Sequence, residues 1–267
     1  MRRFITYKIG LIILLLFVFA SCEKVIDIDL NETEEQLVVD ALVSNQTNQS
    51  FVRLSKSNSL FSDQEYQNVS NANVIVTSSE NDIFSFSEVE AGLYKNDDFV
   101  GVEGLDYKLE IDWDEINISA NSRMPLAVAI DSIELVVTEE GFMGNDEITY
   151  SLKIHFTDPA EQTNYYRFDV FKNDSLYDGF FISNDLFFNG ISTYQFLMGL
   201  EMQPLDTICV QLSSIDEANY SYFLVLSQSN SPFNIAPGNP VSNIQGEAIG
   251  YFGAYAQARK YIIIPEQ

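Results

Sequence analysis

The sequence predicts a mainly β protein, in which an antiparallel β-sandwich is followed by a larger β-domain with one prominent helix. Three observations favour this class. Short strand-like runs recur from residue 36 to 124 and are separated by Asn, Ser, Asp and Gly. Half-buried strand patterns of alternating apolar and polar residues continue between residues 130 and 172. One segment, near residues 215–229, carries the start signal of a helix.

The chain begins with the pattern of a bacterial lipoprotein export signal. Basic residues precede an apolar run from Leu11 to Ala20, and small residues precede Cys22. At about ten to twelve apolar residues, the run is too short to span a bilayer. We therefore predict a signal peptide over residues 1–21 and lipidation at Cys22, which would become the new N-terminus. The alternative is an ordinary secreted protein with an incidental cysteine.

The mature chain is predicted to be strongly acidic. The full sequence has a formal net charge of −25, and loss of three basic residues with the signal peptide leaves 11 Lys and Arg against 39 Asp and Glu, or −28. Such a field repels nucleic acid and anionic headgroups over roughly 8 Å at physiological salt. We therefore expect no nucleic-acid partner, and membrane contact through the N-terminal lipid alone. Cys209 would remain as a single, inert strand residue without a disulfide.

Residues 22–35 alternate acidic and aliphatic residues directly behind the predicted anchor. We interpret them as an acidic tether. Acidic residues in this position resemble the surface-export signals of Bacteroidota lipoproteins. A merely solvated linker is the alternative interpretation.

Residues 36–124 are predicted to form the first domain, a β-sandwich. Seven strands are expected: Gln36–Val43, Phe51–Ser57, Val74–Ser78, Asp82–Ser87, Gly92–Lys95, Tyr107–Asp112 and Asn117–Met124. The segments Val69–Val76, Gly92–Tyr94 and Gly104–Leu109 resemble immunoglobulin-like modules of the carboxypeptidase-regulatory type. That resemblance implies a fold and hardly a function.

Residues 125–267 are predicted to form the second, larger β-domain, because Pro125 interrupts strand pairing after Met124. Its first strands are expected at 130–140, 147–158 and 164–172, with the single histidine, His155, on a polar strand face.

The helix and the end of the chain follow. Ser214 and Glu217 have the spacing of a capping box, which predicts a helix through about Ser229. Residues 246–255 and 261–264 are then expected to close the sheet as two terminal strands.

Two segments are predicted to contact a partner or a ligand. The first, from Phe180 to Phe196, is dense in aromatic residues, for which a core position is the competing interpretation. The second, from Ser231 to Asn243, is a loop with three prolines. The contact candidates are Phe180, Phe181, Phe187, Phe188, Pro232, Phe233, Pro237, Pro240 and Asn243.

Chemical motifs do not favour an enzyme. The sequence has no Gly-rich phosphate loop, no Cys/His cluster with zinc spacing and no Gly-x-Ser-x-Gly elbow. Carboxylates two residues apart in Asp112–Glu115, beside the single tryptophan, fit the end of a hairpin as well as a glycosidase site. Acidic turns at Asp97-Asp98, Asp112–Glu115 and Asn145–Glu147 lack the spacing of a defined calcium loop. We predict no catalytic residue, no metal site and no cofactor, with calcium the alternative.

The order and spacing of several short motifs resemble an uncharacterised lipoprotein family of Bacteroidota, known as domain of unknown function 4249 (DUF4249). The motifs are Cys22–Ile26, Gly92–Tyr94 with Gly104–Tyr107, Met124-Pro125 with Ile130–Ser132, Asp158-Pro159 with Asn164–Tyr166, Tyr220–Phe223, Ser231–Phe233, Pro240–Ile244 with Gly246, and Gly250–Tyr255. The sequence departs from the family pattern around Asn239–Val241 and lacks a second glycine near Glu247.

This resemblance implies an outer-membrane lipoprotein that faces the cell exterior and works beside a TonB-dependent transporter. We therefore expect a non-enzymatic accessory or ligand-binding partner of that β-barrel. An architectural subunit of another outer-membrane assembly is the competing hypothesis. A surface hydrolase is a third, which the missing motifs disfavour.

Overall fold

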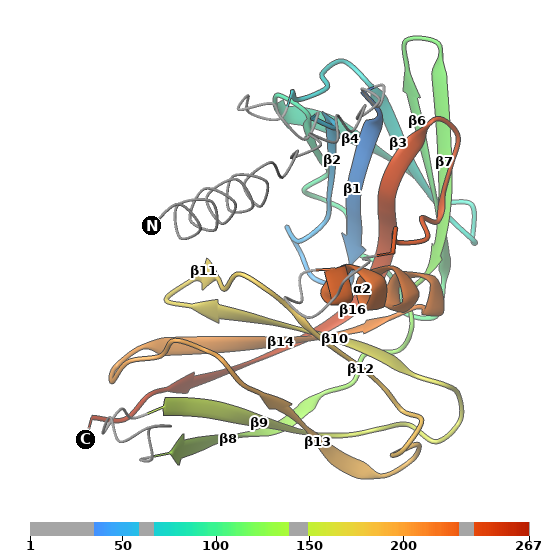
Figure 1. Ribbon diagram of the computed structural model, residues 1–267. Coiled ribbons are helices and arrows are strands. Elements are labelled where there is room, and N and C mark those ends of the chain that lie inside the picture. Colours follow the sequence, from blue (N-terminus) through green and yellow to red (C-terminus); the bar gives the residue numbers. More distant parts are fainter. Residues whose placement is uncertain (1–34, 59–66, 139–148, 230–237, 267) are drawn as a thin grey trace, which may run out of the picture. The chain divides into compact units, whose positions relative to one another are not determined.

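The computed structural model describes residues 35–58, 67–138, 149–229 and 238–266 (Figure 1). The predicted signal peptide, Cys22 and nearly all of the predicted tether lie outside these residues. Within them, no helix is both long and apolar enough to cross a membrane.

The structure confirms the mainly β class. The described residues form one helix, α2 (Glu217–Ser229), and sixteen strands. The strands are β1 (Leu37–Ser44), β2 (Phe51–Lys56), β3 (Asn73–Ser78), β4 (Ile83–Glu90), β5 (Leu93–Lys95), β6 (Asp106–Trp113), β7 (Ile116–Arg123), β8 (Ile130–Thr138), β9 (Thr149–Thr157), β10 (Tyr165–Lys172), β11 (Ser175–Leu176), β12 (Phe181–Asn184), β13 (Ser192–Leu197), β14 (Thr207–Ile215), β15 (Ile244–Gln245) and β16 (Ala248–Ile263). The seven strands expected before residue 125 all exist, with small shifts at their ends.

The strands form two sheets. Thirteen belong to one large sheet with the order β11-β10-β14-β16-β1-β2-β5-β4-β3-β6-β7-β15, with β12 paired to β10. The remaining three form a small sheet, β13-β9-β8. One apolar core is built mainly from residues 37–124, and a second lies between residues 128 and 264. The sandwich arrangement is therefore consistent with the sequence-based expectation.

Strand β16 links the two cores. Its first half pairs in parallel with β1 and its second half pairs antiparallel with β14. Phe252, Ala254 and Ala256 enter the first core, and Ile264, just beyond the strand, enters the second. Residues 35–267 form one compact unit. The predicted domain boundary near residue 125 stays a prediction.

The expectation of two separate terminal strands is wrong, because β16 runs without interruption through sixteen residues. In the sequence, Gln257 and Arg259 interrupt the apolar residues near the end of the chain, which led to the expectation of two strands. In the structure they lie on the opposite face from Ala256 and Ala258, so the alternation of the strand is preserved.

Helix α2 begins two residues later than the predicted capping box requires. Asp216 caps it, since the backbone N–H of Asn219 donates to Asp216 Oδ1 at 2.8 Å. Ser214 belongs to β14, and its buried hydroxyl has no hydrogen-bond partner among the described residues. Ser and Asp both cap helices. Because β14 continues through Ile215, Ser214 stays in the strand and Asp216 caps the helix.

A third apolar cluster holds α2 against the sheet. Phe223 of the helix packs with Ile215 and Tyr255, and Tyr251 lies beside them. The Phe223 and Tyr251 ring centroids are 4.9 Å apart. The helix thus lies against β16, between the two parts of the large sheet (Figure 1).

Candidate ligand-binding cavity

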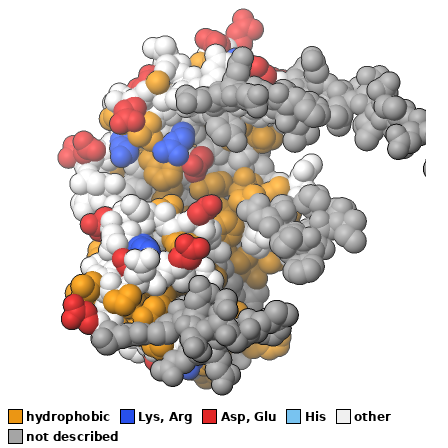
Figure 2. Space-filling view, turned by 60° about the vertical axis from the view of Figure 1, so that its left-hand side comes forward, with side chains coloured by type: hydrophobic (Ala, Val, Ile, Leu, Met, Phe, Trp, Pro, Cys, Tyr) orange, Lys and Arg blue, Asp and Glu red, His pale blue; other side chains and the backbone are white. Residues whose placement is uncertain are grey.

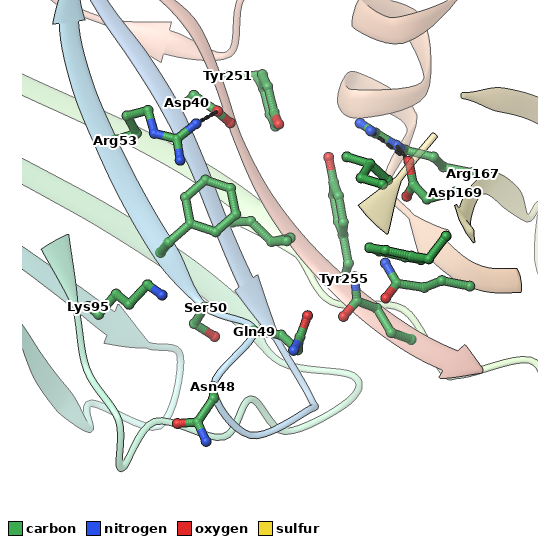
Figure 3. Close-up of a pocket in the computed structure, with 16 residues that line it drawn as sticks. Asp40, Asn48, Gln49, Ser50, Arg53, Lys95, Arg167, Asp169, Tyr251 and Tyr255 are labelled. Atoms are coloured by element: carbon green, nitrogen blue, oxygen red, sulfur yellow. Dashed lines mark hydrogen bonds and ion pairs between the residues drawn. The ribbon is translucent and has the colours of Figure 1, made fainter. Parts of the chain in front are cut away.

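A cavity of about 440 Å³ lies between two parts of the large sheet, with β1, β2, β5 and β16 on one side and β10 and β14 on the other (Figure 3). Ligand pockets in proteins commonly occupy about 300–1,000 Å³. Most of the lining is polar: Asp40, Asn48, Gln49, Ser50, Arg53, Lys95, Arg167, Asp169, Gln211 and Gln257. The remainder is aromatic (Phe51, Phe171, Tyr251, Tyr255) or aliphatic (Leu42, Leu176).

The first wall of the cavity carries a row of three side chains on neighbouring strands. Asp40 of β1 lies opposite Arg53 of β2 and opposite Tyr251 of β16. Directly opposite residues place their side chains on the same face of a sheet. Arg53 Nη1 is 3.9 Å from Asp40 Oδ2, a loose ion pair. Asp40 Oδ1 is buried and has no hydrogen-bond partner within 3.5 Å among the described residues.

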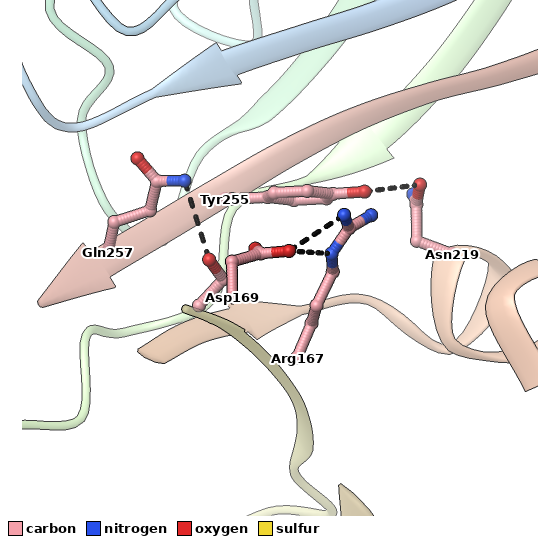
Figure 4. Close-up of polar contacts among 6 residues, drawn as sticks. Arg167, Asp169, Asn219, Tyr255 and Gln257 are labelled. Carbon is pink, nitrogen blue, oxygen red and sulfur yellow. Dashed lines mark hydrogen bonds and ion pairs between the residues drawn. The ribbon is translucent and has the colours of Figure 1, made fainter. Parts of the chain in front are cut away.

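The second wall carries a tight ion pair. Arg167 and Asp169 alternate along β10 with Tyr166, Phe168 and Val170, whose side chains fill the second core. The Nε and Nη2 atoms of Arg167 donate to Asp169 Oδ1 at 3.0 and 2.8 Å (Figure 4).

Aromatic rings hold the same guanidinium group from the side of α2. Its central carbon lies 4.3 Å from the ring centroid of Phe223 and 4.8 Å from that of Phe180. Burial alone would lower the pKa of Arg167, but the adjacent Asp169 carboxylate raises it. Arg167 therefore stays charged, and the pair is a fixed part of the wall.

Tyr251 and Tyr255 line the cavity between the two walls. The Tyr255 hydroxyl donates to Asn219 Oδ1 of α2 at 3.1 Å (Figure 4). Burial raises the pKa of both tyrosines well above its usual value, and the nearby Asp40 carboxylate raises that of Tyr251 further. Both phenols are neutral at physiological pH, so they act here as hydrogen-bonding groups.

Amide side chains complete the floor of the cavity. Gln257 Oε1 accepts a hydrogen bond of 2.7 Å from Ser44 Oγ, and its Nε2 donates to Ser213 Oγ at 3.4 Å. Arg259 donates to Gln211 Oε1 and to Gln49 Oε1, each at 2.7 Å. These contacts join the loop between β1 and β2 to β14 and β16, which fixes the distance between the walls.

The lining of the cavity contains more basic than acidic residues, unlike the chain as a whole. Three of the 14 Lys and Arg residues line it, against two of the 39 Asp and Glu residues. Figure 2 shows one face of the molecule, where the few basic side chains lie close to acidic ones beside a band of apolar side chains. Cations are thus concentrated at the cavity although the whole chain is acidic.

The aromatic contact candidates separate in the structure. Phe180 packs in the cluster under α2, while Phe181 and Phe188 lie at the edge of the second core. Phe187 is 89% exposed, next to Leu186 at 74%. The core interpretation therefore describes three of these four rings, and Phe187 is the one presented to solvent.

The candidates in the proline-containing loop fall into two groups. Pro232, Phe233 and Pro237 lie outside the described residues. Pro240 is half-buried, and Asn243 is engaged within the chain. The Asn243 side chain donates to the Phe252 carbonyl at 2.7 Å and accepts from the Phe252 N–H at 3.0 Å.

Other sequence features have ordinary surroundings. His155 lies on the polar face of β9, 3.0 Å from Glu134. Cys209 is buried in β14, where burial raises its pKa. Trp113 ends β6 and packs against the first core, as expected for a hairpin end. Among the described residues, no group of three or more His, Cys, Asp or Glu could hold a metal ion. Asn145–Glu147 lies outside them.

Sequence reasoning did not bring the cavity residues together. A local signal was present in β10, where Arg167 and Asp169 interrupt a strand of large apolar residues. Charged side chains on a strand with one face in the core must either face water or pair with each other. That signal identifies β10 alone, whereas the opposite wall comes from β1 and β2, more than a hundred residues earlier, and from β5 and β16.

A comparison with known protein families identifies the family of this chain. The sequence model described as Domain of unknown function (DUF4249) matches residues 23–261. The chain belongs to this family. The match confirms the resemblance seen in the sequence, and the DUF4249 region contains every residue that lines the cavity. A comparison with curated proteins finds no match to this DUF4249 chain.

Proposed function

We propose that this DUF4249 protein is a lipid-anchored protein of the outer-membrane surface that binds a ligand as the non-enzymatic accessory of a TonB-dependent transporter. The observation that carries the proposal is the polar cavity of about 440 Å³ between the two parts of the large sheet. The lipoprotein pattern that ends at Cys22 supports the location.

The arrangement of the cavity side chains supports binding over catalysis. A general acid or base needs a free titratable group within reach of the substrate. In the lining, Asp169 is paired with Arg167, and the histidine of the chain lies at β9, outside the cavity. The remaining titratable groups, Asp40 and Lys95, lie beside Arg53 and are suited to hold a charged ligand. Rigid strands with a fixed ion pair provide a preorganised recognition surface.

A transporter barrel would contact a different region. Leu186, Phe187 and Ile191 are exposed in the segment between β12 and β13, and Tyr194 of β13 and Met198, just after that strand, are exposed as well. Exposed apolar side chains that gather in one segment are typical of protein contacts. The same surface supports the alternative function, an architectural subunit of another outer-membrane assembly.

The proposal is tested by purification of the tagged, lipidated, full-length protein from outer membranes in gentle detergent. We expect one TonB-dependent barrel to co-purify at near-equal stoichiometry, and Phe187→Ser to reduce its recovery. A matched variant, Ile83→Ser, changes another exposed apolar residue, in β4, and should leave recovery unchanged.

Other outcomes contradict the proposal in different ways. Co-purification of several structural proteins without a transporter would favour the architectural alternative. Recovery of the lipoprotein alone would argue against a stable barrel partner.

A further inference from the structure

Two cations of the first wall have donors to offer a ligand. The side chain of Lys95 of β5 forms no ion pair or hydrogen bond with any described residue, and Figure 3 shows it directed along the cavity wall below Arg53. Arg53 has one distant carboxylate partner at 3.9 Å and lies 5.7 Å from the Phe51 ring centroid. Most of its five N–H donors are therefore available.

The same wall has a partly exposed acceptor. Asp40 Oδ1 is buried beside Tyr251, but the Asp40 side chain is 36% exposed, and its Oδ2 has only the ion pair of 3.9 Å with Arg53. Asp40 lies in the strand next to Arg53, so this carboxylate and the available donors are close together on one surface. A ligand that satisfies both must present an anionic group and a hydrogen-bond donor within a short span.

The opposite wall does not compete for either group. Arg167 and Asp169 pair with each other, and Gln211 is engaged with Arg259. Gln257 of β16 is likewise engaged, with Ser44. Aromatic rings of Phe51, Phe171 and Tyr255 provide apolar area for the body of a small molecule.

Resting on the proposed ligand-binding role, we infer that the cavity binds a small carboxylate that carries a hydroxyl or ammonium donor close to its anionic group. Lys95 and Arg53 contact the carboxylate of the ligand, and the accessible side of the Asp40 carboxylate accepts from the neighbouring donor. The shared chemistry covers two sources, the hydroxy acids, including sugar acids, and the amino acids or short peptides.

Calorimetric titration of the full-length lipidated protein in detergent at low salt tests this inference. The probes are D-glucuronate, glycine, D-glucose and propionate. D-glucose lacks the anionic group, and propionate lacks the donor. We expect D-glucuronate or glycine to bind at least tenfold more tightly than both D-glucose and propionate, and to bind more weakly as salt is raised.

Three substitutions assign the contacts. Lys95→Gln and Arg53→Gln should each weaken binding of the preferred probe by about tenfold, the effect of losing one charge-assisted hydrogen bond. Lys108→Gln is the matched control, because Lys108 is an exposed lysine of β6 outside the cavity, and it should change nothing. Asp40→Asn separates the sources: an ammonium donor loses most of its affinity, whereas a hydroxyl donor still finds an acceptor.

The inference is overturned if D-glucose or propionate binds as well as the charged probes, if none of the four binds, or if Lys95→Gln and Arg53→Gln leave affinity unchanged. Preferential binding of the uncharged probe, D-glucose, would contradict the carboxylate inference but would still agree with the proposed ligand-binding role. Failure of the transporter proposal would show separately, as loss of barrel co-purification with probe binding intact.

Discussion

The ring of Tyr255 lies directly over Gly253 on the same strand. A Cβ built on Gly253 would stand 2.2 Å from Cε1 and 2.5 Å from Cζ of that ring. The absence of a side chain thus lets the phenol lie flat along β16 and reach Asn219 in α2. The ring position, the helix position and the cavity wall depend on one another.

Gly253→Ala should displace the Tyr255 ring and destabilise the fold by about 2 kcal/mol, within the usual range for overpacking of a core. Urea denaturation measures the change. Tyr255→Leu removes the ring with which the new methyl group collides, so the double variant should lose less than the sum of the two single variants. Additive losses would show that Gly253 acts independently of the ring.

Gly250→Ala should be more damaging, because two effects combine. The backbone φ at Gly250 is +112°, and a Cβ there would stand 1.9 Å from the carbonyl oxygen of Val39 in β1. Gly104 is the matched control, since its φ is +85° but no atom lies within 4 Å of its Cβ position.

We expect Gly104→Ala to cost about 1 kcal/mol from backbone strain alone. Gly250→Ala should cost several times more, since it also forces β1 and β16 apart. Thermal unfolding of the two variants side by side measures the difference. Equal losses would mean that the β1–β16 contact tolerates a methyl group.

Asp169→Asn should leave the Arg167 guanidinium buried without its counter-charge. Their side chains are 16% and 9% exposed, so solvent screens the pair only partly. Breaking a buried pair from one side costs about 3–5 kcal/mol, whereas replacing both partners with apolar groups is often nearly neutral. Arg167→Met combined with Asp169→Leu should therefore be more stable than Asp169→Asn alone in chemical denaturation. The reverse order would show that the pair is itself a major source of stability.

Alkaline pH should unfold the protein through Tyr251 and Tyr255. Their folded-state pKa values are raised by burial, so the unfolded chain loses these protons first as pH rises past about 10. The free energy of unfolding then falls by up to about 1.4 kcal/mol per pH unit for each tyrosine.

Urea titrations between pH 8 and 11 measure this slope. Tyr251→Phe combined with Tyr255→Phe should reduce this slope, whatever the variant's stability at pH 8, and Tyr166 of the second core, whose pKa is also raised by burial, should account for part of the slope that remains. An unchanged slope in the double variant would assign alkaline unfolding to other groups.

Phe187 and Phe188 offer a test of neighbouring rings with opposite roles. Phe187 is 89% exposed, whereas the Phe188 ring lies 5.8 Å from that of Phe156 in the second core. Phe187→Ser should change the melting temperature little, and Phe188→Ser should lower it by several degrees. Scanning calorimetry of both variants decides, and similar losses would place both rings in the core.

Much of the strand pattern follows from the sequence because its cause is local. In β9, the alternation of Tyr150, Leu152, Ile154 and Phe156 with polar residues places four side chains in the second core, as predicted. Turn residues bound the early strands in the same way. Local chemistry does not choose between two competent caps, which is why Asp216 rather than Ser214 begins α2.

The candidate site could not be predicted because its parts are distant in the chain. Asp40 and Tyr251 meet through parallel pairing of β1 and β16, which leaves no turn motif between them. The aromatic segment around Phe187 attracted attention by its density, yet most of its rings fill core volume. The residues that line the cavity are common polar types, and they form a candidate site only because the fold brings them together.

The sharing of β16 also orders events during synthesis and folding. Ser44 bonds Gln257, a partner 213 positions later, and the edge of β1 stays unpaired until β16 has been made. Contacts so distant in the chain are slow to form and expose strand edges in the meantime. Both cores therefore stay incomplete until β16 has been made, and a chain that ends before residue 248 would leave both halves unfinished.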